Sequence, residues 1–416
     1  MSLDRRVVVT GLGIVSCIGN NIGDYWNFLI NGISGIGNIT NFDVTKYRTH
    51  VGGEVKRFNP ENYLSFKDIK RFDKFCQFAI AASDDAMKMA GLPMDLSTSF
   101  DPSRIGVLVG SGVGGIRSLE KGFYTLYQKG PDKVSPLIIP MFIIDIASGN
   151  LSMRYCARGP NMSIATACSS SSHSIGESYW IIKRNDADIM ISGGAESSIS
   201  PISFAGFCAM RAMSTNNDPK KASRPFDANR DGFVMSEGSG IVILEELEHA
   251  KKRKANIYAE IVGYGASADA HHITIPDPNG EGIYLAVNTA LKHANLSVDD
   301  IDGINAHGTS TKLNDKTETL AYKRIFKNHI NNINISSIKG TIGHNLGAAG
   351  AIESISCIKS IIDGIIPPTI NYETKDPECD LNYTPNIAVE KNIDVMLNLN
   401  CGFGGHNAAI IFKKFS

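Results

Sequence analysis

The chain has 416 residues, of which 43% are hydrophobic and 20% charged, and its formal net charge is -1. This length exceeds what one small hydrophobic core supports, and the composition is that of a globular protein. The near-zero net charge excludes a general binder of nucleic acid or of acidic membrane surfaces.

Apolar runs alternate with segments of helical periodicity along the whole chain, which predicts an α/β fold. In the first half we expect helices over 71–90 and 169–185. The strands expected there cover 5–10, 105–110, 161–166, 188–193 and 238–245. A charged run over 245–256 follows, and we interpret it as a solvated helix face at a junction.

The pattern restarts after this junction, because residues 257–265 echo residues 6–13. The elements expected next are a helix over 281–294, a strand over 301–306, a helix over 343–362 and strands over 395–400 and 408–413. The sequence therefore predicts two similar α/β halves, residues 1–255 and 256–416.

The N-terminal residues and the hydropathy bear on where the protein works. Residues 1–6 pass directly into an apolar run, which leaves no room for a signal peptide. No stretch approaches the roughly 18 consecutive apolar residues of a transmembrane helix. We expect no membrane contact and a cytoplasmic location, or an organelle stroma or matrix if a targeting segment has been removed.

Cys168 is the first candidate for chemistry, because it lies between a strand-like run and a helical run. A helix N-terminus lowers the pKa of a thiol and offers free N–H groups to a developing negative charge. Read alone, Cys168 also fits a small buried apolar residue, as free cysteines usually are. The eight cysteines are scattered with no CxxC pair, so we expect neither structural disulfides nor a cysteine metal site.

Two histidines and a lysine lie far downstream, each in a glycine-rich turn. His307 ends a strand, and Lys339 precedes His344 by five residues at a glycine-rich helix entry that something must approach closely. Asp315 or Glu318 is the expected partner of Lys339. These wide separations exclude a local chelating motif, and we expect neither a metal nor a cofactor. A nucleophilic cysteine with neutral histidine donors suits thioester chemistry better.

Two further glycine-rich segments call for interpretation. Residues 110–115 satisfy the GxGxxG pattern, but no strand ending in an acidic residue follows about 20 residues later, so a tight turn lining a pocket is favoured over a dinucleotide site. Residues 400–407 form a flexible loop carrying Phe403. That composition is typical of a gate or of a second oxyanion donor.

Four separated motifs resemble those of the β-ketoacyl-acyl carrier protein synthases. They are residues 166–170, 306–311, 339–350 and 402–405, and residues 6–13 and 224–233 match as well. The resemblance spans nearly the whole chain with the motifs in the family's order. It is closest to the elongating Cys-His-His type, particularly synthase II, rather than to the initiating Cys-His-Asn type.

The resemblance implies a thiolase-like fold, in which two α/β halves form a five-layered α-β-α-β-α sandwich, and a homodimer. It implies a decarboxylating Claisen condensation in fatty-acid elongation, with acyl and malonyl groups carried by acyl carrier protein. Cys168 would accept the acyl chain, and His307 and His344 would bind the malonyl thioester carbonyl and assist decarboxylation. The backbone N–H groups of Cys168 and Phe403 would form the oxyanion hole.

The family pattern also implies supporting roles. Lys339 would hold the histidine electrostatics in place, with Glu318 as its partner, and Phe403 would be the gate. The residues expected to contact the substrate are Val113, Phe207, Thr309, Thr311 and Glu318, the first two in the acyl tunnel. The residues expected to dock the carrier are Lys67, Lys70 and Arg71, with Lys74, and Arg211. The alternative interpretation of the basic turn over 67–74 is a helix face that is exposed to solvent and binds no partner.

The sequence departs from the family pattern at one position, and three other functions are alternatives to the condensing enzyme. Cys401 stands where the family usually has Phe, which puts the preferred chain length in doubt. The alternatives are a non-catalytic partner subunit, a biosynthetic thiolase and a dinucleotide oxidoreductase. The retained set of Cys168, His307, Lys339 and His344 disfavours the first two.

Overall fold

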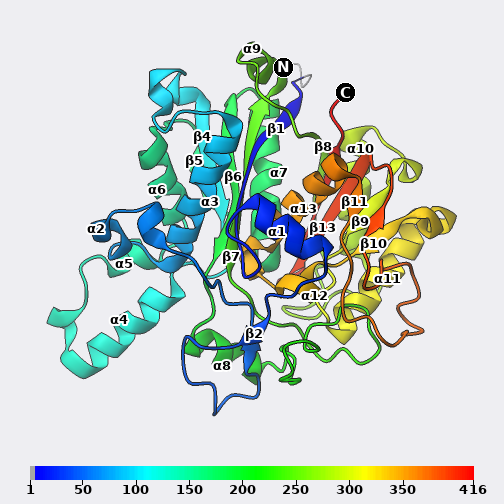
Figure 1. The fold of residues 1–416 in the computed structure, drawn as a ribbon, viewed down its shortest axis with the longest axis horizontal. Coiled ribbons are helices and arrows are strands. Elements are labelled where there is room, and N and C mark those ends of the chain that lie inside the picture. The colour runs from blue at the N-terminus through cyan, green and yellow to red at the C-terminus, as the bar shows by residue number, and fades with distance from the viewer. Residues whose placement is uncertain (1–4) are drawn as a thin grey trace.

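The computed structural model describes residues 5–416, in which ten strands form one mixed sheet (Figure 1). Their order across the sheet is β5-β4-β6-β7-β1-β8-β14-β13-β9-β10. The first five to appear in the chain are β1 (Val7–Val15), β4 (Ile105–Gly110), β5 (Asn161–Met162), β6 (Ile189–Glu196) and β7 (Gly238–Glu246). The others are β8 (Ala259–Ala268), β9 (Gly303–Asn305), β10 (Asn334–Ser336), β13 (Val395–Gly402) and β14 (His406–Lys413).

The two halves of this sheet have the same topology. The first half runs β5-β4-β6-β7-β1 and the second runs β10-β9-β13-β14-β8. In each half the first two pairings are parallel and the last two are antiparallel. The halves join where β1 pairs with β8 in antiparallel register, from Val7 opposite Ile261 to Val9 opposite Ala259.

Helices lie between the two half-sheets and outside them. The central layer contains α7 (Ser170–Lys183) and α13 (Ala349–Asp363), which pack on each other and on strands of both halves. The outer layer of the first half contains α3 (Lys74–Ala90) and α6 (Ile146–Tyr155), and that of the second contains α10 (Glu281–Ala294) and α11 (Lys312–Phe326). The result is the five-layered thiolase-like fold.

Strand periodicity explains how each half-sheet serves two cores. In β4, Val107 and Val109 face the outer core of the first half, whereas Leu108 faces the central core. Successive side chains of a strand point to opposite faces, so a strand buried on both sides is apolar throughout. This is why the strands read as continuous apolar runs.

The remaining elements are further helices and two small sheets. The helices are α1 (Ile22–Ile30), α2 (Phe66–Ile69), α4 (Ile116–Lys129), α5 (Ile138–Phe142), α8 (Pro201–Ala209), α9 (Leu247–Lys252) and α12 (Lys339–Ile342). Two small sheets pair β2 (Gly37–Asn38) with β3 (Val51–Gly52) and β11 (Ile365–Ile366) with β12 (Val389–Glu390). Within residues 5–416, no helix has both the length and the apolar character needed to cross a bilayer.

Several expected boundaries are wrong. The strand predicted over 161–166 pairs only at Asn161 and Met162. The helix predicted over 343–362 begins at Ala349, because Gly343 has φ +73° and Leu346 has φ +47°, which place a turn before it. The predicted helix 71–90 begins at Lys74, where the Asp73 side chain accepts the N–H of Phe75 as an N-cap.

The GxGxxG segment forms a packed turn rather than a phosphate cradle. A Cβ atom on Gly112 would lie 2.8 Å from the Glu196 carboxylate, and one on Gly115 would lie 2.1 Å from the carbonyl oxygen of Met141. A pyrophosphate has no room on such a backbone. The turn is absent from the lining of the cavity described below, so its expected place beside a pocket stays a prediction.

Candidate active site

Cys168 lies in a short 3-10 turn, Ala167–Ser169, that leads directly into α7. Ala167 adopts φ +49°, an uncommon conformation for a residue with a side chain, and so bends the chain sharply before the nucleophile. The Cys168 side chain is buried. The predicted position at a helix N-terminus is therefore what the structure shows.

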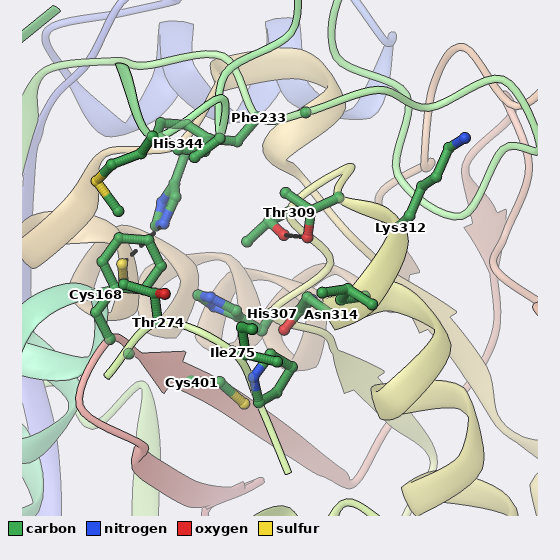
Figure 2. A pocket seen from close by; sticks show the side chains of 18 of the residues that line it. Cys168, Phe233, Thr274, Ile275, His307, Thr309, Lys312, Asn314, His344 and Cys401 are labelled. Carbon is green, nitrogen blue, oxygen red and sulfur yellow. Dashed lines mark hydrogen bonds between the residues drawn. The ribbon is translucent and has the colours of Figure 1, made fainter. Parts of the chain in front are cut away.

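The two histidines converge on this sulfur from the second half of the chain. His344 Nε2 lies 3.1 Å from Cys168 Sγ, and the His307 and His344 rings are 5.4 Å apart at 84°. One ligand atom from each of the three side chains lies within 4.8 Å of the others. Figure 2 shows Cys168, His307 and His344 grouped at one end of the pocket.

Lys339 stands behind the histidines, but its partner differs from the one expected. Its ammonium group forms a fully buried ion pair with Glu353 of α13, not with Glu318 or Asp315. Asn400 donates to the other Glu353 oxygen at 2.6 Å and accepts a hydrogen bond from Ser172 of α7. A lone carboxylate within the small and apolar residues of 346–358 was the signal in the sequence.

Glu318 instead holds the turn that carries His307. Its two oxygens accept the backbone N–H groups of His307 at 2.8 Å and Gly308 at 2.6 Å. Burial raises its pKa to about 7, and the neighbouring carboxyl of Asp315 adds to that rise. Asp315 is engaged elsewhere, 3.4 Å from the Arg230 guanidinium. Both acids are thus satisfied within the fold and leave Lys339 to Glu353.

Burial dominates the protonation of the reactive groups. It raises the pKa of Cys168 to about 12, although the Lys339 charge and a hydrogen bond with the Phe403 backbone act in the opposite direction. Burial and the nearby Lys339 charge hold the pKa values of His307 and His344 well below the ordinary 6.5. The resting site therefore contains a protonated thiol and two neutral imidazoles at neutral pH.

A cavity of about 380 Å³ opens onto these side chains. It is lined by the three reactive residues and by several predicted substrate contacts, namely Phe207, Thr309 and Thr311. The lining also includes residues that sequence reasoning did not single out, among them Phe233, Asp269, His272, Thr274, Ile275 and Lys312. They come from segments far apart in the chain, and only Phe233 belongs to a motif named above, residues 224–233.

Phe403 lies in the turn between β13 and β14, where its ring contacts other aromatic rings. The ring centroids of Phe403 and Phe207 are 6.3 Å apart. The rings of Phe233 and His344 continue the row, with centroids 5.3 Å apart for Phe207 and Phe233 and 5.4 Å apart for Phe233 and His344. A Cβ atom on Gly402 would lie 3.2 Å from the backbone nitrogen of Cys168. Glycine at 402 thus permits the close approach of this turn to the nucleophile.

Cys401 lies beside the turn that carries Phe403 and also lines the cavity. It packs against the outer core of the second half, and burial raises the pKa of its thiol well above the usual value. All eight cysteines are free.

The structure does not bring every predicted substrate or docking residue to this cavity. Val113 is 39% exposed, Glu318 is fully buried, and neither residue belongs to the lining. Lys67, Lys70 and Arg71 are exposed on α2 and the following turn. Lys74 does not belong with them, because its ammonium lies 2.6 Å from the buried carboxylate of Glu237. Arg211 is exposed and contributes to the cavity wall.

Comparison with known proteins agrees with this architecture. The N-terminal domain model of β-ketoacyl synthases matches residues 4–250, and the C-terminal domain model matches residues 258–373. The 3-oxoacyl-[acyl-carrier-protein] synthase 2 of Synechocystis is 48% identical over 99% of this chain and 98% of its own length. The synthase 2 of Staphylococcus aureus is 46% identical over all of both chains.

Solved structures give the same result. A β-ketoacyl synthase from Burkholderia phymatum superposes with a TM-score of 0.92 at 32% identity, covering 99% of this chain and 100% of that one. A type II polyketide ketosynthase, solved in complex with its acyl-carrier protein, also gives 0.92 at 33% identity and the same coverage. The chain belongs to the β-ketoacyl synthase family.

Proposed function

We propose that this protein is a 3-oxoacyl-[acyl-carrier-protein] synthase of fatty-acid elongation. It condenses an acyl group held on Cys168 with malonyl-acyl carrier protein and releases CO2 and a 3-oxoacyl chain two carbons longer. The observation that carries this proposal is the convergence of Cys168, His307 and His344 in one cavity, with His344 Nε2 3.1 Å from the sulfur. Relatives 46–48% identical over almost the whole chain are synthases of this kind.

The first step transfers the acyl chain to Cys168. The sulfur attacks the carrier thioester, and His344 Nε2 accepts the thiol proton because a thiol with its pKa raised to about 12 does not ionise unaided. The carrier thiolate leaves and takes up a proton from solvent. The His344 ring returns to its neutral form by losing its Nδ1 proton, which leaves Nε2–H as the donor for the next step. The backbone N–H groups of Cys168 and Phe403 stabilise the oxyanion formed during the transfer.

The second step removes CO2 from the malonyl thioester. Cleavage of the bond to the carboxylate leaves an electron pair that is delocalised as an enolate. His307 and His344, neutral because their pKa values are lowered, donate hydrogen bonds to the developing enolate oxygen. The buried Lys339 charge keeps both rings neutral, so they act as donors without becoming cations.

The third step forms the new carbon–carbon bond. The enolate carbon attacks the acyl carbonyl on Cys168, and the oxyanion hole again accepts the negative charge. The Cys168 thiolate is expelled and takes up one proton. Phe403 and Phe207 line the entry of the acyl chain, and Thr309 and Thr311 border the arm of the incoming carrier.

Other parts of the proposal concern organisation. The chain divides into units 1–255 and 256–416, a division supported by the identical strand order of the two halves. The active form is a homodimer, supported by exposed apolar side chains on α4 and α5. We place it in the cytoplasm, as its relatives are bacterial, or in an organelle stroma or matrix.

The test is the mass of the intact protein after incubation with a long-chain acyl carrier protein. Wild type is expected to gain the mass of one acyl group, and Cys168→Ala is expected to gain none. Acylation that persists in the variant would remove Cys168 from its role. Absence of acylation with every chain length, together with cleavage of acetoacetyl-CoA, would favour a thiolase instead.

A further inference from the structure

The three reactive side chains are also of the kinds that bind soft metal ions. Thiolate sulfur and imidazole nitrogen are ligands that Zn²⁺ prefers, and three protein ligands with one open position form a common type of zinc site. Cys168, His307 and His344 are too far apart in sequence for a chelating motif, but the fold brings one ligand atom of each within 4.8 Å of the other two (Figure 2). Among residues 5–416, no second group of three cysteine, histidine or acidic side chains is gathered this closely.

The distances within this cluster are close to those of a zinc site. Zn–S bonds of about 2.3 Å and Zn–N bonds of about 2.0–2.1 Å place tetrahedral ligand atoms roughly 3.3–3.6 Å apart. His344 Nε2 lies 3.1 Å from Cys168 Sγ, so this pair must open slightly, and the separations to His307 are at most 4.8 Å. Side-chain movements on the order of 1 Å therefore suffice. The fourth position faces the cavity of about 380 Å³, from which water can enter.

The charges around the sulfur favour a cation. The Lys339 ammonium is paired with the Glu353 carboxylate, so this pair is neutral. Glu196 adds a second buried carboxylate, which accepts the backbone N–H groups of Gly112 at 2.7 Å and Gly347 at 3.1 Å. The ammonium and both carboxylates act on the charge of the sulfur, and together they leave one negative charge. Further out, the cavity wall balances two cations with two carboxylates, namely Arg211, Lys312, Asp231 and Asp269.

The imidazole rings lack the outer partner that a permanent zinc site provides. In such a site the second ring nitrogen of each histidine donates to a carboxylate or carbonyl oxygen, which fixes the ring. The Nδ1 atoms of His307 and His344 are buried and have no hydrogen-bond partner among the described residues. Nothing therefore fixes the ring proton on one nitrogen, so Nε2 can present its lone pair, and a bound ion is exchangeable rather than permanent.

We propose that Cys168, His307 and His344 bind one Zn²⁺ ion, with water as the fourth ligand, and that this reversible state is inactive. Binding breaks the S–H bond of Cys168, forms a sulfur–zinc bond and releases the thiol proton to solvent. The ion occupies the nucleophile and both hydrogen-bond donors, so it blocks acylation and decarboxylation together. The loss of activity rests on the proposed function, whereas the coordination itself does not.

The test uses Co²⁺ in place of Zn²⁺ on the full chain, because tetrahedral Co²⁺ bound to a thiolate gives a sulfur-to-metal charge-transfer band. We expect wild type to show this band with one ion per chain, and Zn²⁺ to abolish it by displacement. Cys168→Ser should lose the band. His307→Ala and His344→Ala should each weaken Co²⁺ binding by roughly tenfold or more.

Cys208→Ser is the matched control, because Cys208 is also a free and partly buried cysteine but lies on α8, outside the cluster. It should bind Co²⁺ as wild type does. A band that persists in Cys168→Ser or disappears in Cys208→Ser would place the ion at another cysteine, and no band in wild type would remove the site.

Protection by the acyl group gives an independent check. Wild type acylated on Cys168 has no free thiolate and should not show the band, so a band of full intensity on the acylated protein would overturn the role of this sulfur. Failure of wild type to acylate Cys168 in metal-free buffer would contradict the proposed function, whereas it would leave the result of the Co²⁺ titration unchanged.

Discussion

At the scale of single residues, the Cys168 thiol is protonated at rest, because burial raises its pKa to about 12. Attack on a thioester therefore depends on His344 at 3.1 Å rather than on a preformed thiolate. The decarboxylation step makes a different demand, because it needs the two neutral imidazoles and no nucleophile. The two half-reactions should thus be separable by mutation.

Cys168→Gln is the variant that separates them. The glutamine amide has the shape of an acylated cysteine and directs its oxygen toward the oxyanion hole. We expect condensation to be lost while malonyl-carrier decarboxylation persists or rises. Adding His307→Ala or His344→Ala should then lower the release of CO2 by roughly 100-fold. An undiminished rate in both histidine variants would overturn their assignment, with circular dichroism showing that each variant is folded.

The pH dependence of decarboxylation follows from the lowered histidine pKa values. A cationic ring still donates a hydrogen bond, but its charge pairs with the malonyl carboxylate and stabilises the group that must leave as CO2. Decarboxylation is therefore present above the histidine pKa and falls as pH drops through it. Because burial and Lys339 hold these values well below 6.5, the acid limb should lie below pH 6.5. Lys339→Gln removes the repelling charge and should move that limb to higher pH.

This shift is best measured in the Cys168→Gln background, from about pH 5 to about pH 8. A Lys339→Gln/Glu353→Gln double variant is the control, because it also removes the carboxylate left without a partner. Both variants should show the limb at higher pH than the parent. A limb at the same pH in all three proteins would mean that Lys339 does not set the histidine protonation.

At the scale of elements, sequence patterns predicted which strands and helices exist but missed how turns divide them. The run 343–362 has helical composition throughout, yet positive φ angles at Gly343 and Leu346 place His344 in a turn. Likewise Lys339 was found but its partner was not. Glu353 is 14 residues from Lys339 in the chain, nearer than Asp315 or Glu318, but the helical pattern around Glu353 does not show that its side chain meets the lysine. Partner choice depends on packing between layers, which one sequence does not display.

The expected close approach to the glycine-rich segment is confirmed and gives a prediction. A Cβ atom on Gly347 would lie 2.1 Å from the backbone nitrogen of Gly112, so Gly347→Ala must displace two turns next to the site. We expect a loss of at least about 2 kcal/mol in the free energy of unfolding. Gly206→Ala in α8 meets nothing within 4 Å and should stabilise by roughly 0.5–1 kcal/mol.

Urea denaturation of the Gly347→Ala and Gly206→Ala variants measures both changes in the free energy of unfolding. Equal stabilities for Gly347→Ala and wild type would show that the two turns separate easily, and that the site is less tightly packed than the contact implies.

At the scale of the whole molecule, the two halves share one topology, but the reactive groups are divided between them. The first half supplies Cys168, and the second supplies His307, Lys339, His344 and Phe403. The restart of the sequence pattern near residue 257 predicted the repeat. It could not show that α7 and α13 would meet in a shared central layer, which is what brings Cys168 to within reach of His344.

We expect the second copy of the proposed homodimer to bind at the open edge of the first half. The strand β5 ends the sheet and pairs only with β4 within the described chain, so its other edge is open. Exposed apolar side chains lie on β5 itself and on α4, α5 and α6 of the same half, namely Phe123, Tyr124, Tyr127, Ile139, Met153 and Met162. Open strand edges and contiguous apolar patches are typical of protein interfaces.

A homodimer through this face also accounts for the position of Val113. This residue is exposed in the single chain and lies in the turn that leads into α4, so a second copy would cover it. Tyr127→Glu/Met162→Glu places two charges in the interface and should convert the dimer to monomers in light scattering after size exclusion. Ile387→Glu, at a residue equally exposed but in the second half, should leave the dimer intact.

If Val113 borders the acyl tunnel only in the dimer, the monomeric variant should lose acylation by long chains more than by short ones. A monomeric wild type would contradict both statements, whereas a dimeric double variant would place the interface elsewhere.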